Sequence, residues 1–185
     1  IPASGITEED RSMIKGEALF LRGYQYFLLV NNYKEVPLRL IPSNEDETNK
    51  GPASEAALWT QVEEDLGNAI KCNLPVERTT AKERVTKGAA IAMLGKVYAT
   101  QHKYPEAKQL LVSLLSAPYS YELVDDFAKN FTNEEEFNKE SVYEIAYSPD
   151  GEYSWSNESG ICLGCYIPQF IGPVKSGGWA KLMPN

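Results

Sequence analysis

The chain has 185 residues, and its hydrophobic share of 43% and charged share of 24% are those of an ordinary folded protein. With 18 basic and 26 acidic residues, its formal net charge is −8. This charge argues against a general nucleic-acid surface and against a polybasic contact with anionic lipid, because no basic stripe is available to neutralise phosphates. No apolar run approaches the roughly 18 residues that a membrane-spanning helix needs. The chain opens on Ile1 without a methionine, and we interpret it as a fragment or a processed product.

The first predicted helix runs from Ile6 to Asn31. Thr7 is a good N-cap, and acidic residues follow it where the helix dipole favours them. Apolar residues recur at three- and four-residue steps and form the predicted buried stripe, which consists of Met13, Ile14, Ala18, Leu21, Tyr24, Phe27 and Leu28. The aromatic side chains of this helix are expected to pack in the core; they are Phe20, Tyr24, Tyr26 and Phe27.

A long connection separates this helix from the next one. Val36–Leu40 is predicted to be extended, because Pro37 disfavours helix at the residue before it. Asn44–Gly51 is polar and acidic but lacks the ligand spacing of a calcium-binding loop, so we interpret it as a solvated connection. Ser54 is the predicted N-cap of the second helix, whose buried stripe is Leu58, Val62, Leu66, Ala69 and Ile70. The acidic run Glu63-Glu64-Asp65 is expected on its solvated face.

Arg84–Tyr119 is predicted to form two consecutive amphipathic helices around a turn at His102–Pro105. The stripe of the first consists of Ala90, Met93, Leu94, Val97 and Tyr98, and that of the second of Ala107, Leu110, Leu111, Leu114 and Leu115. Gly95 marks a place where a partner helix must approach closely, since a mid-helix glycine costs about 1 kcal/mol relative to alanine. The order of large and small residues follows the tetratricopeptide pattern.

The character of the chain changes after Tyr119. Ser141–Tyr147 alternates and is rich in β-formers, so it is predicted to be a short strand. We therefore expect a mostly α fold in which residues 1–119 form tetratricopeptide-like helical hairpins of an α-α superhelix, with a loop insert at 32–53. Residues 120–185 are expected to form an irregular segment with the short strand and long loops, truncated at the C-terminus.

Residues that could carry catalytic or metal chemistry are few. Cys162 and Cys165 have CxxC spacing, but a zinc site needs about four ligands, and Cys72 and His102 are the only other soft candidates. We interpret the cysteines as structural or incidental, with a loop disulfide as the main exception. His102 is predicted at a helix–helix turn, and no serine or cysteine has a second histidine to activate it. No cofactor, no metal and no enzymatic activity are expected.

Several motifs follow one another along the chain. Gly16–Val30 is similar to E-A-x-x-L-R-A-x-x-Y-F-x-L-V, and Asn32–Leu38 to Y-G-x-V-P-L, with Lys34 in place of the glycine. The second helix is similar to I-x-x-D-L-x-x-A, and the third to T-K-x-A-A-x-A-L-L-A-K-V-Y-L, with Gly95 in place of Ala or Leu. Further matches lie at Tyr104–Ala107, Tyr119–Leu123, Glu140–Tyr147 and Gly177–Pro184. In this order the motifs resemble the SusD/RagB family, which comprises surface nutrient-binding lipoproteins of Bacteroidetes.

The resemblance implies a SusD-like fold and a function. Members of the family bind glycans or other oligomeric nutrients and do no chemistry on them, so an oligosaccharide ligand at the cell surface is expected. Their tetratricopeptide-like helices contact a TonB-dependent outer-membrane transporter of the SusC type, which is the expected partner. Known members are longer, which implies that a lipid-anchored N-terminal segment, the expected link to the outer membrane, and a large C-terminal part are absent here.

The predicted ligand-binding residues follow from chemistry and not from the resemblance. Sugar recognition needs flat apolar faces with polar groups at the rim. Tyr153 and Trp155 fall in one loop with Asp150, and Tyr166 follows them, so these residues are the predicted glycan contacts. The alternative is that such rings cover the helical scaffold, as most aromatics do, and Trp179 in particular is interpreted as structural. The alternative function is a helical-repeat adaptor for protein partners.

Overall fold

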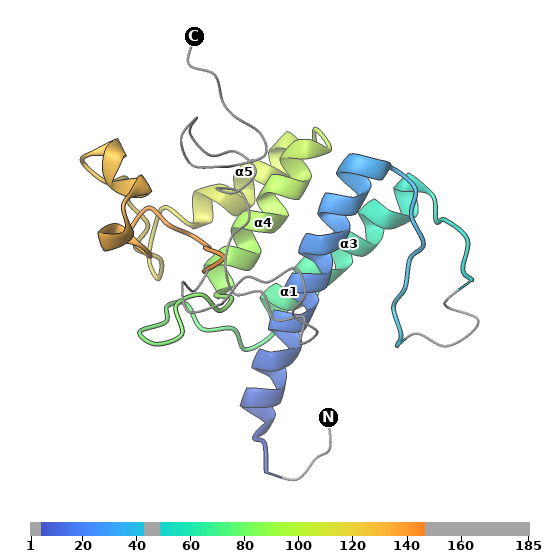
Figure 1. Ribbon diagram of the computed structural model, residues 1–185, viewed down its shortest axis with the longest axis horizontal. Coiled ribbons are helices and arrows are strands. Elements are labelled where there is room, and N and C mark those ends of the chain that lie inside the picture. The colour runs from blue at the N-terminus through green and yellow to red at the C-terminus, as the bar shows by residue number, and fades with distance from the viewer. Residues whose placement is uncertain (1–4, 43–48, 147–185) are drawn as a thin grey trace, which may run out of the picture. The chain divides into compact units, whose positions relative to one another are not determined.

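The computed structural model describes residues 5–42 and 49–146. The chain divides into two compact units, residues 1–144 and 145–185, and the fold below is that of the first. Its α-helices are α1 (Glu8–Tyr33), α3 (Glu55–Lys71), α4 (Lys87–Thr100) and α5 (Tyr104–Ser113) (Figure 1). Two short 3-10 helices follow, Phe127–Phe131 and Asn133–Glu135. The predicted mostly α fold is confirmed.

The helices form two antiparallel pairs, as the sequence predicted. Helix α1 packs against α3, α3 against α4, and α4 against α5. Figure 1 shows each pair running in opposite directions, with α4 between α3 and α5. This position explains why α4 is buried nearly all round, and its predicted stripe is confirmed because Ala90 and Val97 are fully buried.

Helix α1 begins where predicted, but its buried face is different. The Thr7 side chain accepts a hydrogen bond from the Asp10 amide at 3.1 Å and so caps the helix. The buried residues are Gly16, Phe20, Gly23, Tyr26, Phe27 and Val30. Leu21 and Leu28 of the predicted stripe are instead 45% and 38% exposed, so the predicted stripe was partly wrong. The expectation that the aromatic residues pack in the core is confirmed.

Two glycines explain this difference. A Cβ at Gly23 would lie 3.0 Å from Leu66 Cγ of α3, and one at Gly16 would lie 2.8 Å from Cys72 Cβ. The face of α1 that meets α3 therefore contains glycines as well as large residues. A pattern of large apolar residues in the sequence does not reveal such a face. The predicted stripe of α3 is confirmed, since Leu58, Val62, Leu66 and Ala69 are fully buried and Ile70 packs against them.

Helix α5 is only half covered. Ala107 and Leu114 are buried as predicted, but Leu111 is 39% and Leu115 77% exposed, so the predicted stripe was too long. The helix ends at Ser113, so Leu115 lies beyond it, and α4 is the only described helix that packs against α5. Gly95 confirms its predicted role, because a Cβ there would lie 2.7 Å from Leu111 Cδ2.

The connection between α1 and α3 is closed at its base. Val36 and Ala53 form an isolated antiparallel bridge, in which the Ala53 amide donates to the Val36 carbonyl at 3.0 Å. Near it, the buried Tyr26 hydroxyl accepts a hydrogen bond from the Arg39 amide at 2.7 Å. These contacts hold the predicted extended segment against α1.

The predicted strand at Ser141–Tyr147 is not formed. Residues 141–146 are neither helix nor strand, and Tyr147 lies outside the described residues. A strand needs a neighbouring edge to satisfy its backbone groups. Here the segment is held through side chains instead, because Glu144 accepts the Phe137 amide at 2.9 Å and the Tyr143 ring packs edge-on against Phe20 at 5.1 Å.

Candidate ligand-binding site

The predicted glycan-contacting residues lie outside the part of the chain that the structure describes. These residues are Asp150, Tyr153, Trp155 and Tyr166, and the same holds for Cys162, Cys165 and Trp179. The ligand contacts and the open question of a loop disulfide therefore stay predictions.

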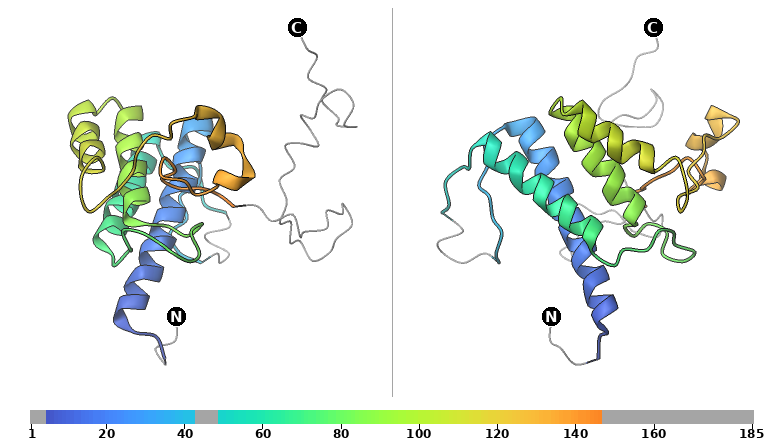
Figure 2. Two further views of the ribbon diagram at one scale, coloured as in Figure 1. Left: turned by 90° about the vertical axis from the view of Figure 1, so that its left-hand side faces the viewer. Right: turned by 180° about the vertical axis from the view of Figure 1, so that it is seen from behind.

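Within the described residues, a pocket of about 300 Å³ lies at the N-terminal end of α4. It is lined by the connection before α4, by residues 118–121 after α5, and by residues 137–144. Figure 2 shows the connection before α4 (green) and the segments after α5 (yellow to orange) beside this end of the helix. Its volume is at the lower end of the range for small-molecule sites.

Aromatic rings form one part of the wall. Tyr119 and Tyr121 are stacked, with their ring centroids 6.2 Å apart and an interplanar angle of 11°. Tyr143 also lines the pocket and connects it to the core through Phe20. Burial raises the pKa of Tyr119 and that of Tyr143, so both phenols stay neutral at physiological pH.

A glycine sets the place of Tyr121. A Cβ at Gly88, the second residue of α4, would lie 2.2 Å from the Tyr121 hydroxyl oxygen. Only glycine leaves room for this phenol against the first turn of the helix. The stacked pair is therefore positioned by the scaffold and not only by its own loop.

Polar groups line the remainder of the wall. Lys82 and Lys139 contribute ammonium groups, and Glu77 and Glu144 contribute carboxylates. Lys139 forms an ion pair with Glu122 at 3.1 Å. Hydroxyls of serine and threonine and the amide of Asn138 also line the pocket, so donors and acceptors surround the rings.

An ion-pair cluster holds the connection before α4 in place. Glu17 of α1 accepts hydrogen bonds from Arg78 and, at 2.6 Å, from Arg84. Arg78 also donates to the Val85 carbonyl at 3.1 Å. Because the Arg78 and Glu17 side chains are only 10% and 13% exposed, this cluster fixes the pocket wall to the helical scaffold.

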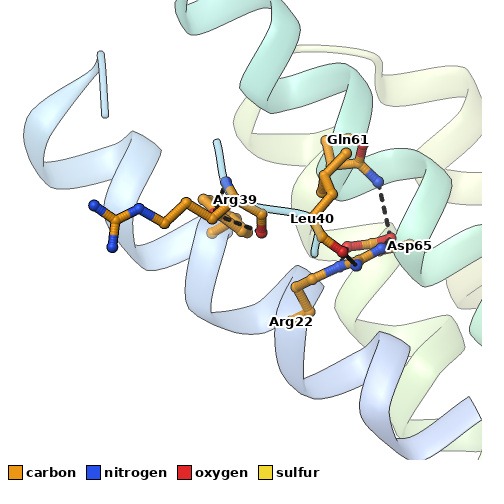
Figure 3. Close-up of polar contacts among 6 residues, drawn as sticks. Arg22, Arg39, Leu40, Gln61 and Asp65 are labelled. Atoms are coloured by element: carbon orange, nitrogen blue, oxygen red, sulfur yellow. Dashed lines mark hydrogen bonds and ion pairs between the residues drawn. The ribbon is translucent and has the colours of Figure 1, made fainter. Parts of the chain in front are cut away.

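A second polar cluster braces α1 and α3 (Figure 3). The Arg22 guanidinium donates to both carboxylate oxygens of Asp65, at 2.7 and 2.6 Å. Gln61 donates to the same carboxylate at 2.9 Å, and Arg22 also reaches the Leu40 carbonyl at 3.4 Å. The bond to Asp65, more than any other contact, raises the pKa of Arg22. Asp65 is 1% exposed, so the prediction that it lies on the solvated face was wrong.

Within the described residues, no group of three or more His, Cys, Asp and Glu residues could hold a metal ion. His102 is exposed at the turn between α4 and α5, as predicted, and its Nδ1 lies 2.8 Å from the Tyr104 hydroxyl. No helix in this part of the chain is long and apolar enough to cross a membrane.

Sequence reasoning missed this pocket. Its only local signal is the Tyr119-Ser120-Tyr121 triplet after Pro118, which places two rings close together. The other walls come from segments about 40 residues before this triplet and about 20 residues after it. No periodicity in the sequence relates these segments to the triplet. Their meeting depends on how α4 and α5 pack.

Comparison with known proteins places this helical scaffold in one family. Residues 3–99 match the SusD-like family model described as "Starch-binding associating with outer membrane". A SusD superfamily protein from Bacteroides vulgatus is 35% identical, with a TM-score of 0.68 over 76% of this chain and 30% of that one. A "Laminarin binding SusD-like protein" is 34% identical, with a TM-score of 0.78 over 84% of this chain and 35% of that one. A SusD-like protein from Bacteroides fragilis is 30% identical, with a TM-score of 0.69 over 78% of this chain and 29% of that one.

The two antiparallel helix pairs thus define a tetratricopeptide-like scaffold of the SusD type. The chain belongs to the SusD-like family. No curated protein matches its sequence significantly. The chain spans about a third of the length of the solved structures above. The matched region covers 30%, 35% and 29% of those three chains.

Proposed function

We propose that this protein binds oligosaccharides at the cell surface, without chemical change, and passes them to a TonB-dependent outer-membrane transporter. The observation that carries the proposal is the family match over residues 3–99, whose description joins starch binding with the outer membrane. A solved relative at 34% identity is described as laminarin-binding, which supports a glycan as the ligand class. The transporter is of the SusC type in this proposal, and a lipid anchor holds the protein to the membrane.

The proposed glycan contacts outside the described residues are Tyr153, Trp155 and Tyr166, with Asp150 at the rim. They combine ring faces for the C–H side of a pyranose with a carboxylate for its hydroxyls. We propose them on this chemistry alone. The stacked tyrosines of the described pocket offer the same combination on a rigid support.

Isothermal titration against a panel of oligosaccharides tests the binding part of the proposal. The panel contains uncharged members (laminari-, malto-, cello-, xylo- and mannohexaose) and acidic ones (oligogalacturonate and oligomannuronate). Heat of binding with at least one member is expected, with the sugar recovered unchanged after prolonged incubation. Binding of unrelated peptides without binding of any glycan would instead support a helical-repeat adaptor and contradict the glycan proposal.

The delivery part is tested separately. A tagged protein purified from outer membranes under mild conditions is expected to carry a TonB-dependent transporter with it. The matched control is the same purification from cells that lack the gene of the recovered transporter. Recovery without any transporter would remove the delivery step and leave glycan binding intact.

A further inference from the structure

We propose that the pocket at the N-terminal end of α4 binds an uncharged sugar residue, with Tyr119 and Tyr121 as its stacking surface. This inference rests on the proposed function and adds a site and a ligand class to it. Its lining residues differ from the proposed contacts Tyr153 and Trp155 in the sequence.

The rings are prepared for stacking before any ligand arrives. Tyr119 and Tyr121 are already parallel, at 6.2 Å between centroids, and both line the pocket. Gly88 leaves the space that Tyr121 occupies beside α4. A sugar that meets rigid rings loses little free energy to side-chain ordering, because the rings are already fixed.

The polar groups suit hydroxyls. Each sugar hydroxyl is both a donor and an acceptor, so it needs partners of both kinds. The pocket supplies donors from Lys82, Lys139 and the tyrosine phenols, and acceptors from Glu77 and Glu144. Among the described residues, the hydroxyls of Tyr119, Tyr121 and Tyr143 form no hydrogen bond, so each can bind a ligand oxygen.

The charges of the pocket favour an uncharged ligand over an acidic one. Arg78 is paired with Glu17, and Lys139 with Glu122. Among the described residues, Lys82, Glu77 and Glu144 form no ion pair, so the remaining lining side chains carry one positive and two negative charges. A carboxylate or sulfate would meet no excess of positive charge, and it would lose hydration without compensation.

The volume sets the size of the ligand. A volume of about 300 Å³ lies at the lower end of the range for small-molecule sites. This space accepts one sugar unit, or the end of an oligosaccharide, and not a buried stretch of chain.

The test uses variants of the protein and the uncharged and acidic panel members named above. Tyr121→Ala is expected to weaken binding of the best uncharged oligosaccharide by about ten-fold or more. Tyr33→Ala is the matched control, because Tyr33 is 69% exposed at the end of α1 and does not line the pocket. It is expected to leave the affinity unchanged.

The variant Gly88→Ala tests whether the position of Tyr121 matters for binding without a loss of stability. The new methyl group displaces the Tyr121 phenol, which is the free end of a side chain, so the melting temperature is expected to stay near that of the wild type. Binding is expected to weaken as in Tyr121→Ala. In the double variant the methyl group meets no phenol, so Gly88→Ala should add nothing to Tyr121→Ala.

The results of these titrations distinguish the pocket site, its ligand class and the proposed function from one another. Wild-type affinity in both pocket variants would overturn the pocket site and leave the proposed glycan binding standing. Binding of acidic members alone would overturn the ligand class. If no glycan binds the wild-type protein, the proposed function fails, and this inference fails with it.

Discussion

At the scale of single residues, buried charge decides how α1 and α3 are joined. Arg22 is a third exposed, whereas Asp65 has almost no access to water, so the carboxylate depends on its hydrogen bonds for compensation. Both partners belong to stretches that resemble family motifs. From the sequence alone, however, the acidic run around Asp65 is predicted to face solvent. Asp65 lies three residues after the buried Val62, so the register of α3 places it on the buried side of the helix.

Asp65→Ala is predicted to lower the free energy of unfolding by about 2 kcal/mol, because it leaves Arg22 and Gln61 without their shared acceptor. Glu64→Ala is the matched control, since Glu64 is the exposed neighbour on the same helix, and a change within about 0.5 kcal/mol is expected there. Urea denaturation followed by circular dichroism measures both. Equal effects of the two substitutions would show that the pair does not brace the helices.

At the scale of elements, glycines decide how closely helices approach. Gly95 lets Leu111 of α5 rest on the backbone of α4, and Gly23 does the same for Leu66 of α3. Gly67 of α3 differs, because a Cβ there would meet nothing within 4 Å. The helices therefore contain glycines of both kinds, those that a neighbouring side chain covers and those that face open space.

Gly95→Ala is predicted to destabilise the protein by about 1–2 kcal/mol, because the overlap with Leu111 outweighs the gain in helix propensity. Gly67→Ala is predicted to stabilise it by up to about 1 kcal/mol, since only the propensity changes. Thermal unfolding of the two variants beside the wild type measures the contrast. A stabilising Gly95→Ala would mean that Leu111 moves aside freely and that α5 is held mainly by other contacts.

The sequence predicted those elements whose signals are local. Caps at Thr7 and Ser54, the stripe of α3 and the close approach at Gly95 depend on neighbours within one or two turns, and all are confirmed. The face of α1 was missed because its contacts lie at glycines. The strand predicted at Ser141–Tyr147 is not formed, because a strand depends on a partner that the segment itself does not contain.

At the scale of the whole molecule, the helical scaffold and the candidate pocket have different origins in the chain. Helices supply the fold by which the chain belongs to its family, whereas the pocket comes from the connections around α4. The cluster of Glu17, Arg78 and Arg84 joins the two, since it ties the connection before α4 to the first helix. The site could not be predicted from sequence, because its walls meet only after the helices have packed.

The net charge of −8 leads to a last prediction, about salt. An acidic chain repels acidic glycans over the Debye length, whereas an uncharged sugar neither gains nor loses from this field. The affinity for the best uncharged oligosaccharide should therefore change by less than about two-fold between about 0.01 and 1 M salt, over which the Debye length falls from ~30 to ~3 Å. Titration calorimetry across this range measures it, with oligogalacturonate as the charged comparison, whose binding should strengthen as repulsion is screened. An affinity that falls steadily with salt would show attraction between opposite charges and contradict an uncharged ligand in the pocket.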